Sequence, residues 1–305
     1  MNTKEINIAF CFDENLWMQA GVTITSLLET SKNTTKYSIY CLISNSINTT
    51  IQNILESNLK KYSSFNSIKF INVENKLTNI KSKQYKPMYY RLLLPQVLPP
   101  SIDKVIYTDV DLIFNDDMQD LYSIDLTNYY IAATKDGYKG NDQHSLWKKY
   151  KICSIAKKEQ YINSGVLLLN LKNIRNNKIY VCWLKLAERE SFPFHDQDII
   201  NITCKDKIIF LPEGYNFSYD NAKIIHFSCG GKKPWSMHSE NLKFAELWWF
   251  YAHKTPFTSF FLANYYKSNI NSLSKVLPKW IGRFICWFVL NKETRHKFFN
   301  KYVKI

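Results

Sequence analysis

The chain has 305 residues, of which 46% are hydrophobic and 22% are charged, and it carries a formal net charge of +14. This composition is typical of a globular protein with one large domain, or one domain and an appendage, and the absence of repeats and low-complexity tracts excludes solenoid and disordered chains. The seven cysteines are irregularly spaced, which favours reduced thiols in a cytosolic protein over a disulfide framework or a zinc site.

Strand-like and helix-like segments alternate along the first three quarters of the chain. We predict strands at 6–12, 37–43, 67–73, 105–114, 129–134, 162–169 and 223–227, and helices at 16–28, 47–60, 173–189 and 194–203. This alternation predicts an α/β fold whose mostly parallel sheet is covered by helices. Neither a G-x-G-x-x-G turn nor a Walker A motif occurs, so we exclude a dinucleotide-binding site and a P-loop. Ligands of open α/β sheets bind beyond the carboxyl ends of the strands, and we therefore look for chemistry in the polar residues there.

Two carboxylates, Asp109 and Asp111, stand in the run KVIYTDVDLIF, directly after the apolar residues of a predicted strand. Unpaired carboxylates are costly to bury, and a divalent cation removes that cost. Mn²⁺ and Mg²⁺ prefer such oxygen ligands and can bridge a diphosphate. The alternative interpretation is a solvated turn with two exposed acids.

A second candidate site is the run IIHFSCGGKKPW, in which a buried strand leads to His226. Gly230 and Gly231 allow a sharp turn or a close approach of the backbone to a ligand, and Lys232 and Lys233 supply positive charge. Together these groups suit a metal-bound diphosphate. Taken alone, a histidine in this position is more often a core residue with satisfied hydrogen bonds.

Two further runs carry polar residues in a similar setting. In HDQDIIN, Asp196 stands where a helix N-cap is expected, which is a purely structural role, while Gln197 and Asp198 remain candidate active-site residues. In YINSGVLLLNL, Asn163 precedes an apolar strand, and a turn is the structural alternative.

Together and in this order, the four runs resemble glycosyltransferase family 8, the group of glycogenin and of bacterial lipopolysaccharide α-galactosyl- and α-glucosyltransferases. The resemblance extends from about Ile6 to Trp235. It implies a GT-A fold, which is a Rossmann-like nucleotide-sugar-binding fold, a UDP-sugar donor, and retention of the anomeric configuration. It also implies a metal site in which Asp109, Asp111 and His226 bind Mn²⁺, with Mg²⁺ as the alternative ion.

The resemblance further implies where the donor binds. The matching residues are Asp13 and Asn15 at the uridine, Arg91, Asp136, Asn163 and Asp196 around the rest of the donor, and Gly230, Lys232 and Lys233 at the diphosphate. The interval from His226 to Lys233 is one residue longer than in the family pattern, so Lys232 and Lys233 are alternatives for one role, as are Gly230 and Gly231.

Retention leaves two mechanisms open. Either Gln197 or Asp198 attacks to form a covalent intermediate, or the acceptor enters on the face that UDP leaves. We favour front-face attack, with Gln197 as an electrostatic support and Lys233 stabilising the departing UDP, because an amide oxygen has no anionic form to activate as a nucleophile.

We therefore predict an enzyme that moves a hexose from UDP-galactose or UDP-glucose onto a lipopolysaccharide or other lipid-linked or cell-surface glycan and forms an α-linkage. The alternative is a non-catalytic nucleotide-sugar or glycan-binding protein on the same fold, whose mark would be a lost metal ligand. Nucleic-acid binding lacks a supporting motif. The segment between Asn216 and His226 is shorter than in the galactosyltransferase type, so the resemblance does not carry over the acceptor.

The last fifth of the chain has a different composition. Residues 242–305 contain eleven Lys and Arg but only two acidic residues, interleaved with Trp, Phe and Tyr. We predict a catalytic domain at 1–240 and a helical, basic, aromatic appendage at 241–305 that binds an anionic membrane surface. Core packing of the aromatic residues is the alternative for 242–257. No signal peptide or spanning helix is recognisable, so we expect a cytoplasmic protein peripherally attached to the inner face of the cytoplasmic membrane.

Overall fold

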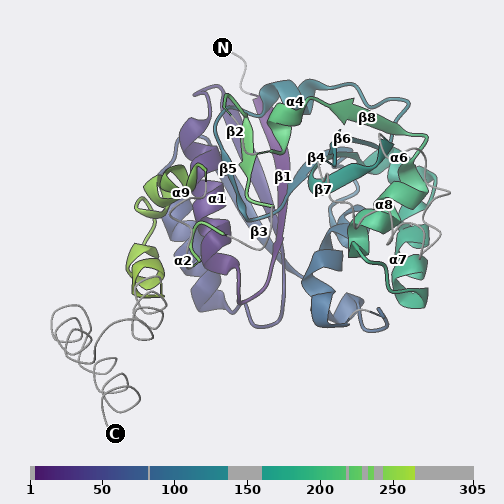
Figure 1. Cartoon of the computed structure of the whole chain (residues 1–305), viewed down its shortest axis with the longest axis horizontal. Helices are drawn as coiled ribbons and strands as arrows, with labels where there is room; N and C mark the ends of the chain where they lie inside the picture. The colour runs from purple at the N-terminus through teal and green to yellow at the C-terminus, as the bar shows by residue number, and fades with distance from the viewer. Residues whose placement is uncertain are drawn as a thin grey trace, which may run out of the picture. The chain divides into compact units, whose positions relative to one another are not determined.

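The computed structural model describes residues 4–81, 83–136, 160–217, 220–228, 233–236 and 243–264 (Figure 1). The chain divides into two compact units, Met1–Cys229 and Gly230–Ile305. The functions predicted for these parts remain predictions, namely catalysis for residues 1–240 and membrane binding for residues 241–305.

The first unit is built on a seven-stranded sheet with the strand order β3-β2-β1-β4-β7-β6-β8. Its strands are β1 (Lys4–Phe12), β2 (Thr35–Ile43), β3 (Phe65–Asn72), β4 (Lys104–Thr108), β6 (Ile131–Lys135), β7 (Ile162–Asn170) and β8 (Ile208–Leu211). In this sheet β7 is the strand that runs antiparallel to its neighbours β4 and β6, while the other pairs are parallel. The predicted α/β fold with a mostly parallel sheet is confirmed.

Helices cover this sheet, which explains why its central strands are apolar along their whole length. The helical segments are α1 (Trp17–Thr30), α2 (Thr49–Leu59), η1 (Glu74–Lys76), η2 (Lys83–Leu93), α3 (Leu94–Val97), α4 (Gln119–Ser123), α6 (Leu171–Asn176), α7 (Ile179–Arg189), α8 (His195–Cys204) and η5 (Glu213–Tyr215). Strands buried on both faces lose the apolar–polar alternation of a half-exposed sheet. Ile8, Ala9 and Phe10 of β1 are accordingly all fully buried. In Figure 1, α1 and α2 lie beside β1 to β3, and α6, α7 and α8 gather around β6 and β7.

The segment 105–114 is not one strand, as the sequence predicted, but two strands in different sheets. β4 ends at Thr108, and β5 (Leu112–Phe114) pairs antiparallel with β9 (Ile224–His226) in a separate two-stranded sheet. The hydroxyl of Thr23 on α1 donates to the carbonyls of Val110 and Leu112, at 2.9 and 2.8 Å, and holds the chain in its new direction. The break falls on the D-x-D run, which therefore lies in the connection between the two sheets.

The other predicted elements differ mainly at their ends. The helix predicted at 194–203 is confirmed as α8, and the strand predicted at 223–227 is confirmed as β9. The single helix predicted at 173–189 is wrong, because it is interrupted at Lys178, whose φ of 54° is left-handed and cannot continue a right-handed helix. The sequence also missed β8 and η2.

Within the second unit, the described residues contain helix α9 (Ala245–Ala252), which carries a cluster of aromatic rings. Trp248 is fully buried, and its ring lies 5.1 Å from that of Trp235 and 4.9 Å from that of Phe261. Phe250 and Phe260, by contrast, are 53% and 49% exposed. The aromatic residues of this segment therefore divide into a packed set and a solvent-facing set. Across the described parts of the chain, no helix is both long and apolar enough to cross a membrane.

Candidate functional site

Polar residues from distant parts of the first unit converge at one edge of the large sheet. The carboxyl ends of β1, β4 and β6 meet there, and the amino end of β7 joins them because β7 runs in the opposite direction. The residues Asp13, Asp109 and Asp136 follow the three parallel strands, and Asn163 lies at the start of β7. This edge is where open α/β sheets bind their ligands.

A possible metal-binding group stands at the centre of this edge. Asp109, Asp111 and His226 each offer one ligand atom, and these three atoms lie within 4.8 Å of one another. The Nε2 atom of His226 is 3.1 Å from Oδ1 of Asp111 and 3.9 Å from Oδ2 of Asp109. The pairing of Leu112 with His226 in the small sheet brings the three together, and the Phe227 N–H donates to the Asp111 carbonyl at 3.0 Å. We call these three residues the metal cluster.

The metal cluster has the chemistry that a divalent cation requires. Two carboxylates and an imidazole nitrogen are suitable ligands for Mn²⁺ or Mg²⁺. Neighbouring ligands of an octahedral ion with bonds of about 2.1 Å lie about 3 Å apart, which agrees with the separation of His226 Nε2 from Asp111 Oδ1. The side chains of Asp109 and Asp111 remain 26% and 18% exposed, so a cation could keep water or a diphosphate as further ligands.

The other oxygen of Asp109 is held by the protein. Oδ1 accepts a hydrogen bond from the Tyr107 hydroxyl at 2.6 Å and forms an ion pair with Arg91 at 2.8 Å. The guanidinium of Arg91 also lies over the Tyr107 ring, 4.4 Å from its centroid. These contacts leave Oδ2 of Asp109 directed toward His226. Arg91, predicted to bind the donor, therefore also orients a predicted metal ligand.

Arg91 joins the metal cluster to helix α8. Its Nε is 3.1 Å from Oδ2 of Asp196, and its Nη1 donates to the carbonyl of Ser164 at 2.7 Å. Burial disfavours the charge on Arg91, but the carboxylates of Asp109 and Asp196 outweigh it and raise the pKa of Arg91. Burial also raises the pKa of Asp196 to about 6, with Arg91 opposing the shift.

The N-cap role expected for Asp196 is wrong. The residue lies inside the first turn of α8, whose cap position is Phe194, and its carboxylate accepts from the Ser164 hydroxyl at 3.0 Å instead. The local pattern favoured a cap, but a buried guanidinium offers a carboxylate a stronger partner than a helix N–H does.

Gln197 and Asp198 also lie on the first turn of α8, and their polar atoms contact the sheet. The Ser164 N–H donates to Oε1 of Gln197 at 3.0 Å, and Nε2 of Gln197 donates to Asp136 at 3.0 Å. Asp198 is fully buried, and its two oxygens accept from the Tyr161 hydroxyl at 2.6 Å and the Phe194 N–H at 2.8 Å. Burial raises the pKa of Asp198. We call Asp196, Gln197 and Asp198 the α8 cluster.

Asn163 lies beside the metal cluster. Its Oδ1 accepts from the Gly165 N–H at 2.9 Å and from Nδ2 of Asn216 at 2.8 Å. The Oδ1 of Asn216 lies 2.7 Å from Nδ1 of His226. The run is therefore connected through Asn216 to the predicted metal ligand, and its interpretation as a turn is wrong, because it lies within β7.

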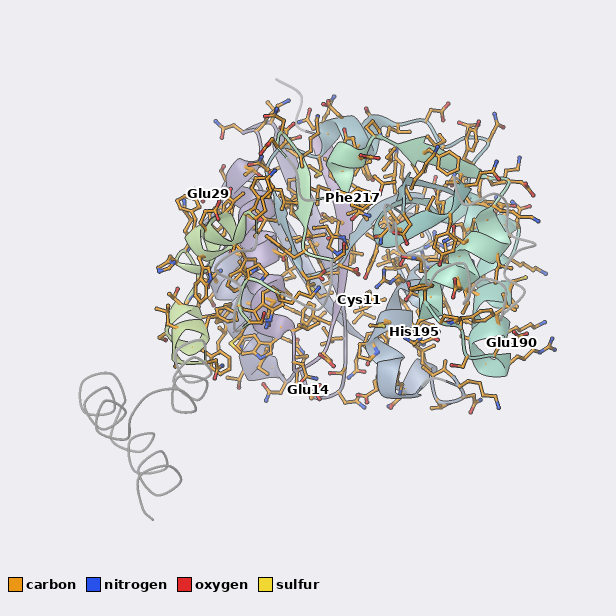
Figure 2. The ribbon with its side chains drawn as sticks, in the orientation of Figure 1. Cys11, Glu14, Glu29, Glu190, His195 and Phe217 are labelled. Atoms are coloured by element: carbon orange, nitrogen blue, oxygen red, sulfur yellow. The ribbon has the colours of Figure 1, made fainter. Side chains whose placement is uncertain are left out.

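Asp13, Asn15 and the residues after β9 complete the predicted set. Asp13 accepts from the backbone and side chain of Asn15, each at 3.0 Å, on the loop that follows β1. Gly230, Gly231 and Lys232 lie outside the described residues. Lys233 belongs to the second unit, where its N–H donates to the Ser236 hydroxyl at 2.9 Å. Cys11 at the end of β1 and His195 at the start of α8 are labelled in Figure 2 and help to locate the edge.

Sequence reasoning did not single out four residues that organise this edge, namely Tyr107, Tyr161, Ser164 and Asn216. One of them carried a usable signal. Tyr107 is two positions before Asp109, so the two side chains leave the strand on the same face, and a buried tyrosine hydroxyl needs a partner. Tyr161 and Asn216 act on residues distant in sequence, and nothing near them in the chain marks their role.

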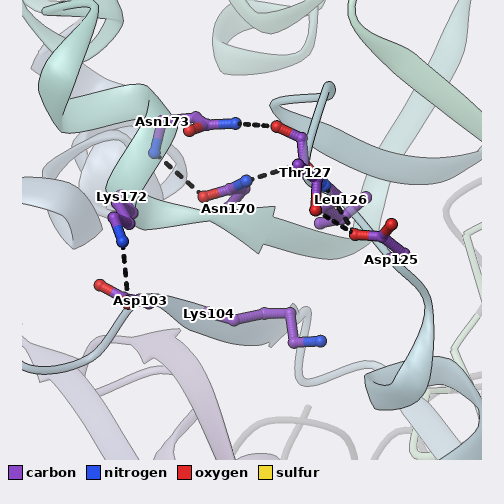
Figure 3. A pocket seen from close by; sticks show the side chains of 8 residues that line it. All are labelled: Asp103, Lys104, Asp125, Leu126, Thr127, Asn170, Lys172 and Asn173. Carbon is purple, nitrogen blue, oxygen red and sulfur yellow. Dashed lines mark hydrogen bonds and ion pairs between the residues drawn. The ribbon is translucent and has the colours of Figure 1, made fainter.

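An open pocket of about 410 Å³ lies at the opposite edge of the sheet (Figure 3). Its carboxylates bind other protein groups, because Asp103 pairs with Lys172 at 3.9 Å and Asp125 accepts from the Thr127 N–H at 2.8 Å. Among the described residues, the side chains that have the spacing of metal ligands are those of the metal cluster, and they lie at the carboxyl edge instead. We therefore assign the functional site to the carboxyl edge.

The family model of glycosyl transferase family 8 matches residues 7–239 of this chain. The chain belongs to glycosyltransferase family 8. The match includes most of β1, the D-x-D run, α8 and β9, so it covers both the metal cluster and the α8 cluster.

This family member is similar in sequence to bacterial proteins and similar in fold to solved structures. A protein of Haemophilus influenzae is 29% identical over 230 residues, which are 73% of this chain and 66% of that protein, so the chain spans just under two thirds of its length. The lipopolysaccharide 1,2-glucosyltransferase of Escherichia coli K12 is 26% identical, over 77% of this chain and 74% of that protein. The crystal structure of the galactosyltransferase LgtC with donor and acceptor sugar analogs has a TM-score of 0.65 at 22% identity, covering 82% of this chain and 96% of that one. This likeness confirms the GT-A fold.

Proposed function

We propose that this family 8 member transfers a hexose, galactose or glucose, from its UDP derivative to a lipopolysaccharide or other cell-surface glycan, with retention and formation of an α-linkage. The observation that carries the proposal is the metal cluster at the carboxyl edge of a GT-A sheet, with all three predicted ligands present and their ligand atoms within 4.8 Å of one another. Similarity to a lipopolysaccharide 1,2-glucosyltransferase supports the choice of acceptor class.

Asp109, Asp111 and His226 would hold Mn²⁺, or Mg²⁺ in its place. A bound ion of this kind neutralises the diphosphate and stabilises UDP as a leaving group. Lys233 would add a second positive charge at the diphosphate, where charge develops as the bond to the sugar breaks. Arg91 would hold Asp109 in its ligand orientation through the 2.8 Å ion pair.

The donor would lie along the edge of the sheet. Asp13 and Asn15 would contact the uridine, since they follow β1. Asp136, Asn163 and Asp196 would face the donor sugar, since they lie near the ends of β6 and β7 and on α8.

Front-face attack accounts best for retention in this site. Asp198 is fully buried with both carboxylate oxygens hydrogen-bonded, which makes it a poor nucleophile. Gln197 is also a poor one, because its amide oxygen is neutral and already accepts from the Ser164 N–H. We assign Gln197 an electrostatic role beside the anomeric carbon.

The test of the proposal is a panel of UDP-hexoses assayed with the full chain and Mn²⁺. UDP release, with a lipopolysaccharide acceptor and without one, is followed before and after EDTA, and the linkage of the product is determined by NMR. We expect one UDP-hexose to be turned over, with activity lost in EDTA and restored by Mn²⁺. Tight binding of a UDP-sugar without turnover on any acceptor would indicate a binding protein instead.

We also propose that residues 241–305 attach the enzyme to an anionic membrane, on the inner face of the cytoplasmic membrane, near a lipid-linked acceptor. Phe250 and Phe260 are exposed, and the ammonium of Lys254 lies 4.6 Å from the Phe250 ring centroid. An exposed ring beside a cation suits a headgroup interface, where each basic residue contributes about 1 kcal/mol.

Vesicle co-sedimentation tests the membrane proposal at low and high salt. Phe250→Ala with Phe260→Ala, and separately a truncation after Ser274, are expected to weaken binding to anionic vesicles. The matched control is Phe210→Ala, since Phe210 is 38% exposed and lies 5.1 Å from the ammonium of Lys135 but belongs to the first unit. Equal binding by the parent, the double variant and the truncation would contradict the proposal.

A further inference from the structure

We propose that Asn216 is a positioning residue for the cation, which works with Asn163 and Gly165 to hold His226 in the tautomer and orientation of a metal ligand. The inference rests on the proposed function, in which His226 binds the metal through Nε2. It adds a residue that neither the sequence motifs nor the geometry of the metal cluster alone would assign.

The polarity of the hydrogen bonds follows from one backbone group. The Gly165 N–H can only donate, so the atom of Asn163 that it meets at 2.9 Å is the carbonyl oxygen Oδ1. That oxygen accepts a second hydrogen bond, at 2.8 Å, so Asn216 presents its NH₂ group to it. The carbonyl oxygen of Asn216 must then face His226.

The same chain of contacts sets the protonation of the imidazole. Nδ1 of His226 lies 2.7 Å from Oδ1 of Asn216, which can only accept, so Nδ1 carries the proton. In the neutral imidazole the lone pair is then on Nε2, the atom that lies 3.1 Å from Asp111 and 3.9 Å from Asp109. Metal-bound histidines are oriented by this kind of hydrogen bond from the other ring nitrogen.

Packing holds the ring in the orientation that the hydrogen bonds select. Asn216 is fully buried and His226 is 4% exposed, so neither side chain has water to turn into. A Cβ atom at position 165 would lie 2.3 Å from Cε1 of His226, which means that the imidazole occupies the space that only glycine leaves. The glycine of the N-S-G run, which lies within β7, is therefore required for contact with the ring.

Loss of the Asn216 acceptor would act on the metal through the ring. A buried Nδ1–H without a partner is costly, so the ring would favour the tautomer with the proton on Nε2. With its proton on Nε2, the ring would have no lone pair on that atom to bind the cation. Removing a hydrogen-bond partner of a metal-bound histidine typically weakens metal binding by about 10- to 100-fold.

The first measurement follows the tautomer without any metal. The full chain, labelled with ¹⁵N-histidine, is examined by long-range ¹H–¹⁵N NMR, and the His226 signals among the six histidines are identified by their loss in His226→Gln. We expect the neutral His226 ring to carry its proton on Nδ1. Asn216→Leu should create a population of neutral rings with the proton on Nε2, whereas Asn216→Asp, which keeps an acceptor for Nδ1, should not.

The second measurement is the affinity for Mn²⁺ in the presence of UDP, from the EPR signal of free Mn²⁺. We expect Asn216→Leu to weaken binding at least about tenfold, and Asn216→Asp, which keeps the acceptor for Nδ1 but loses the donor to Asn163, to weaken it less. The matched control is Asn115→Ala, which removes a 3.2 Å side-chain hydrogen bond to the Ala222 carbonyl near the same small sheet and should leave the affinity unchanged.

A folded Asn216→Leu protein with a protonated Nδ1 and parental affinity would overturn the inference. If circular dichroism shows that Asn216→Leu does not fold, Asn216→Ala takes its place, and loss of the Nδ1 proton in Asn216→Asp would also overturn it. A parent chain that binds no Mn²⁺ even with UDP would refute the proposed function, and the NMR measurement would still decide whether Asn216 sets the tautomer.

Discussion

The metal cluster and the α8 cluster present carboxylates at the same edge of one sheet, but in opposite environments. Asp109 and Asp111 have side chains that are 26% and 18% exposed. Asp196 is only 5% exposed, and Asp198 is fully buried. Both oxygens of Asp198 already accept hydrogen bonds from the protein.

This difference separates the groups that can do chemistry from those that support them. A carboxylate that faces solvent has lone pairs for a cation and can exchange water for a diphosphate. A carboxylate whose lone pairs are taken by buried donors stabilises the fold and positions its neighbours, and it has little capacity to attack a substrate. The metal cluster is therefore the candidate for cation binding, whereas the buried carboxylate of Asp198 is suited to positioning its neighbours.

A substitution of Asp111 is the strongest test of this difference between the two clusters. Asp111→Ala is expected to lower turnover at least about 1000-fold, because a cation that stabilises the leaving group by several kcal/mol loses a ligand. Steady-state UDP release with Mn²⁺ measures this. The matched control is Asp103→Ala, because Asp103 lies just before β4, at the opposite edge, with its side chain 62% exposed. Equal losses in both variants would show that the chemistry does not depend on the metal cluster.

The two lysines after β9 test whether a second cation assists the metal. Under the proposed function Lys233 would stabilise the charge that develops on UDP, so Lys233→Ala is expected to lower turnover about 100-fold. Lys232→Ala should have a milder effect, and each variant serves as the control for the other. The reverse ranking in the same UDP-release assay would assign the diphosphate-binding role to Lys232.

Gly165→Ala sharpens the comparison by disturbing the metal cluster without removing a ligand. The added methyl group would lie 2.3 Å from Cε1 of His226, so the ring must move, and we expect the Mn²⁺ affinity to fall about tenfold. EPR titration in the presence of UDP measures it. Gly214→Ala is the control, because nothing lies within 4 Å of a Cβ atom there. Parental affinity in a folded Gly165→Ala protein would show that the ring position is not critical.

The smallest effect is expected in the α8 cluster. Asp198→Asn should keep turnover within about tenfold, because an amide can accept from the Phe194 N–H and donate to the Tyr161 oxygen. Thermal unfolding should show a modest loss, of about 1 kcal/mol, for the exchanged hydrogen bond. Asp206→Asn, at an exposed position after the same helix, is the control. A loss as large as that of Asp111→Ala would place the nucleophile in the α8 cluster and contradict front-face attack.

The sequence by itself determined several of the main strands and helices, and which motif residues lie at their ends, although it missed β8 and η2. Apolar runs such as β1 and β2 and the helix α8 depend on the side chains of near neighbours, so local patterns predict them. Asp109 and Asp111 follow the apolar residues of one predicted strand and His226 ends another, so the sequence predicts that both runs lie near a ligand-binding edge. The resemblance to family 8 predicted that Asp109, Asp111 and His226 belong to one metal site.

Tertiary structure alone decided how those residues are held. The chain changes sheets at Val110 because Thr23, on a separate helix, binds its carbonyl. Asp196 pairs with Arg91 instead of capping α8 because a buried guanidinium is a stronger partner than a helix N–H. The contact of Asn216 with His226 depends on burial and on the polarity of hydrogen bonds between residues distant in sequence. Local propensity carries no information about such partners, because they meet only when the sheet and its helices have packed.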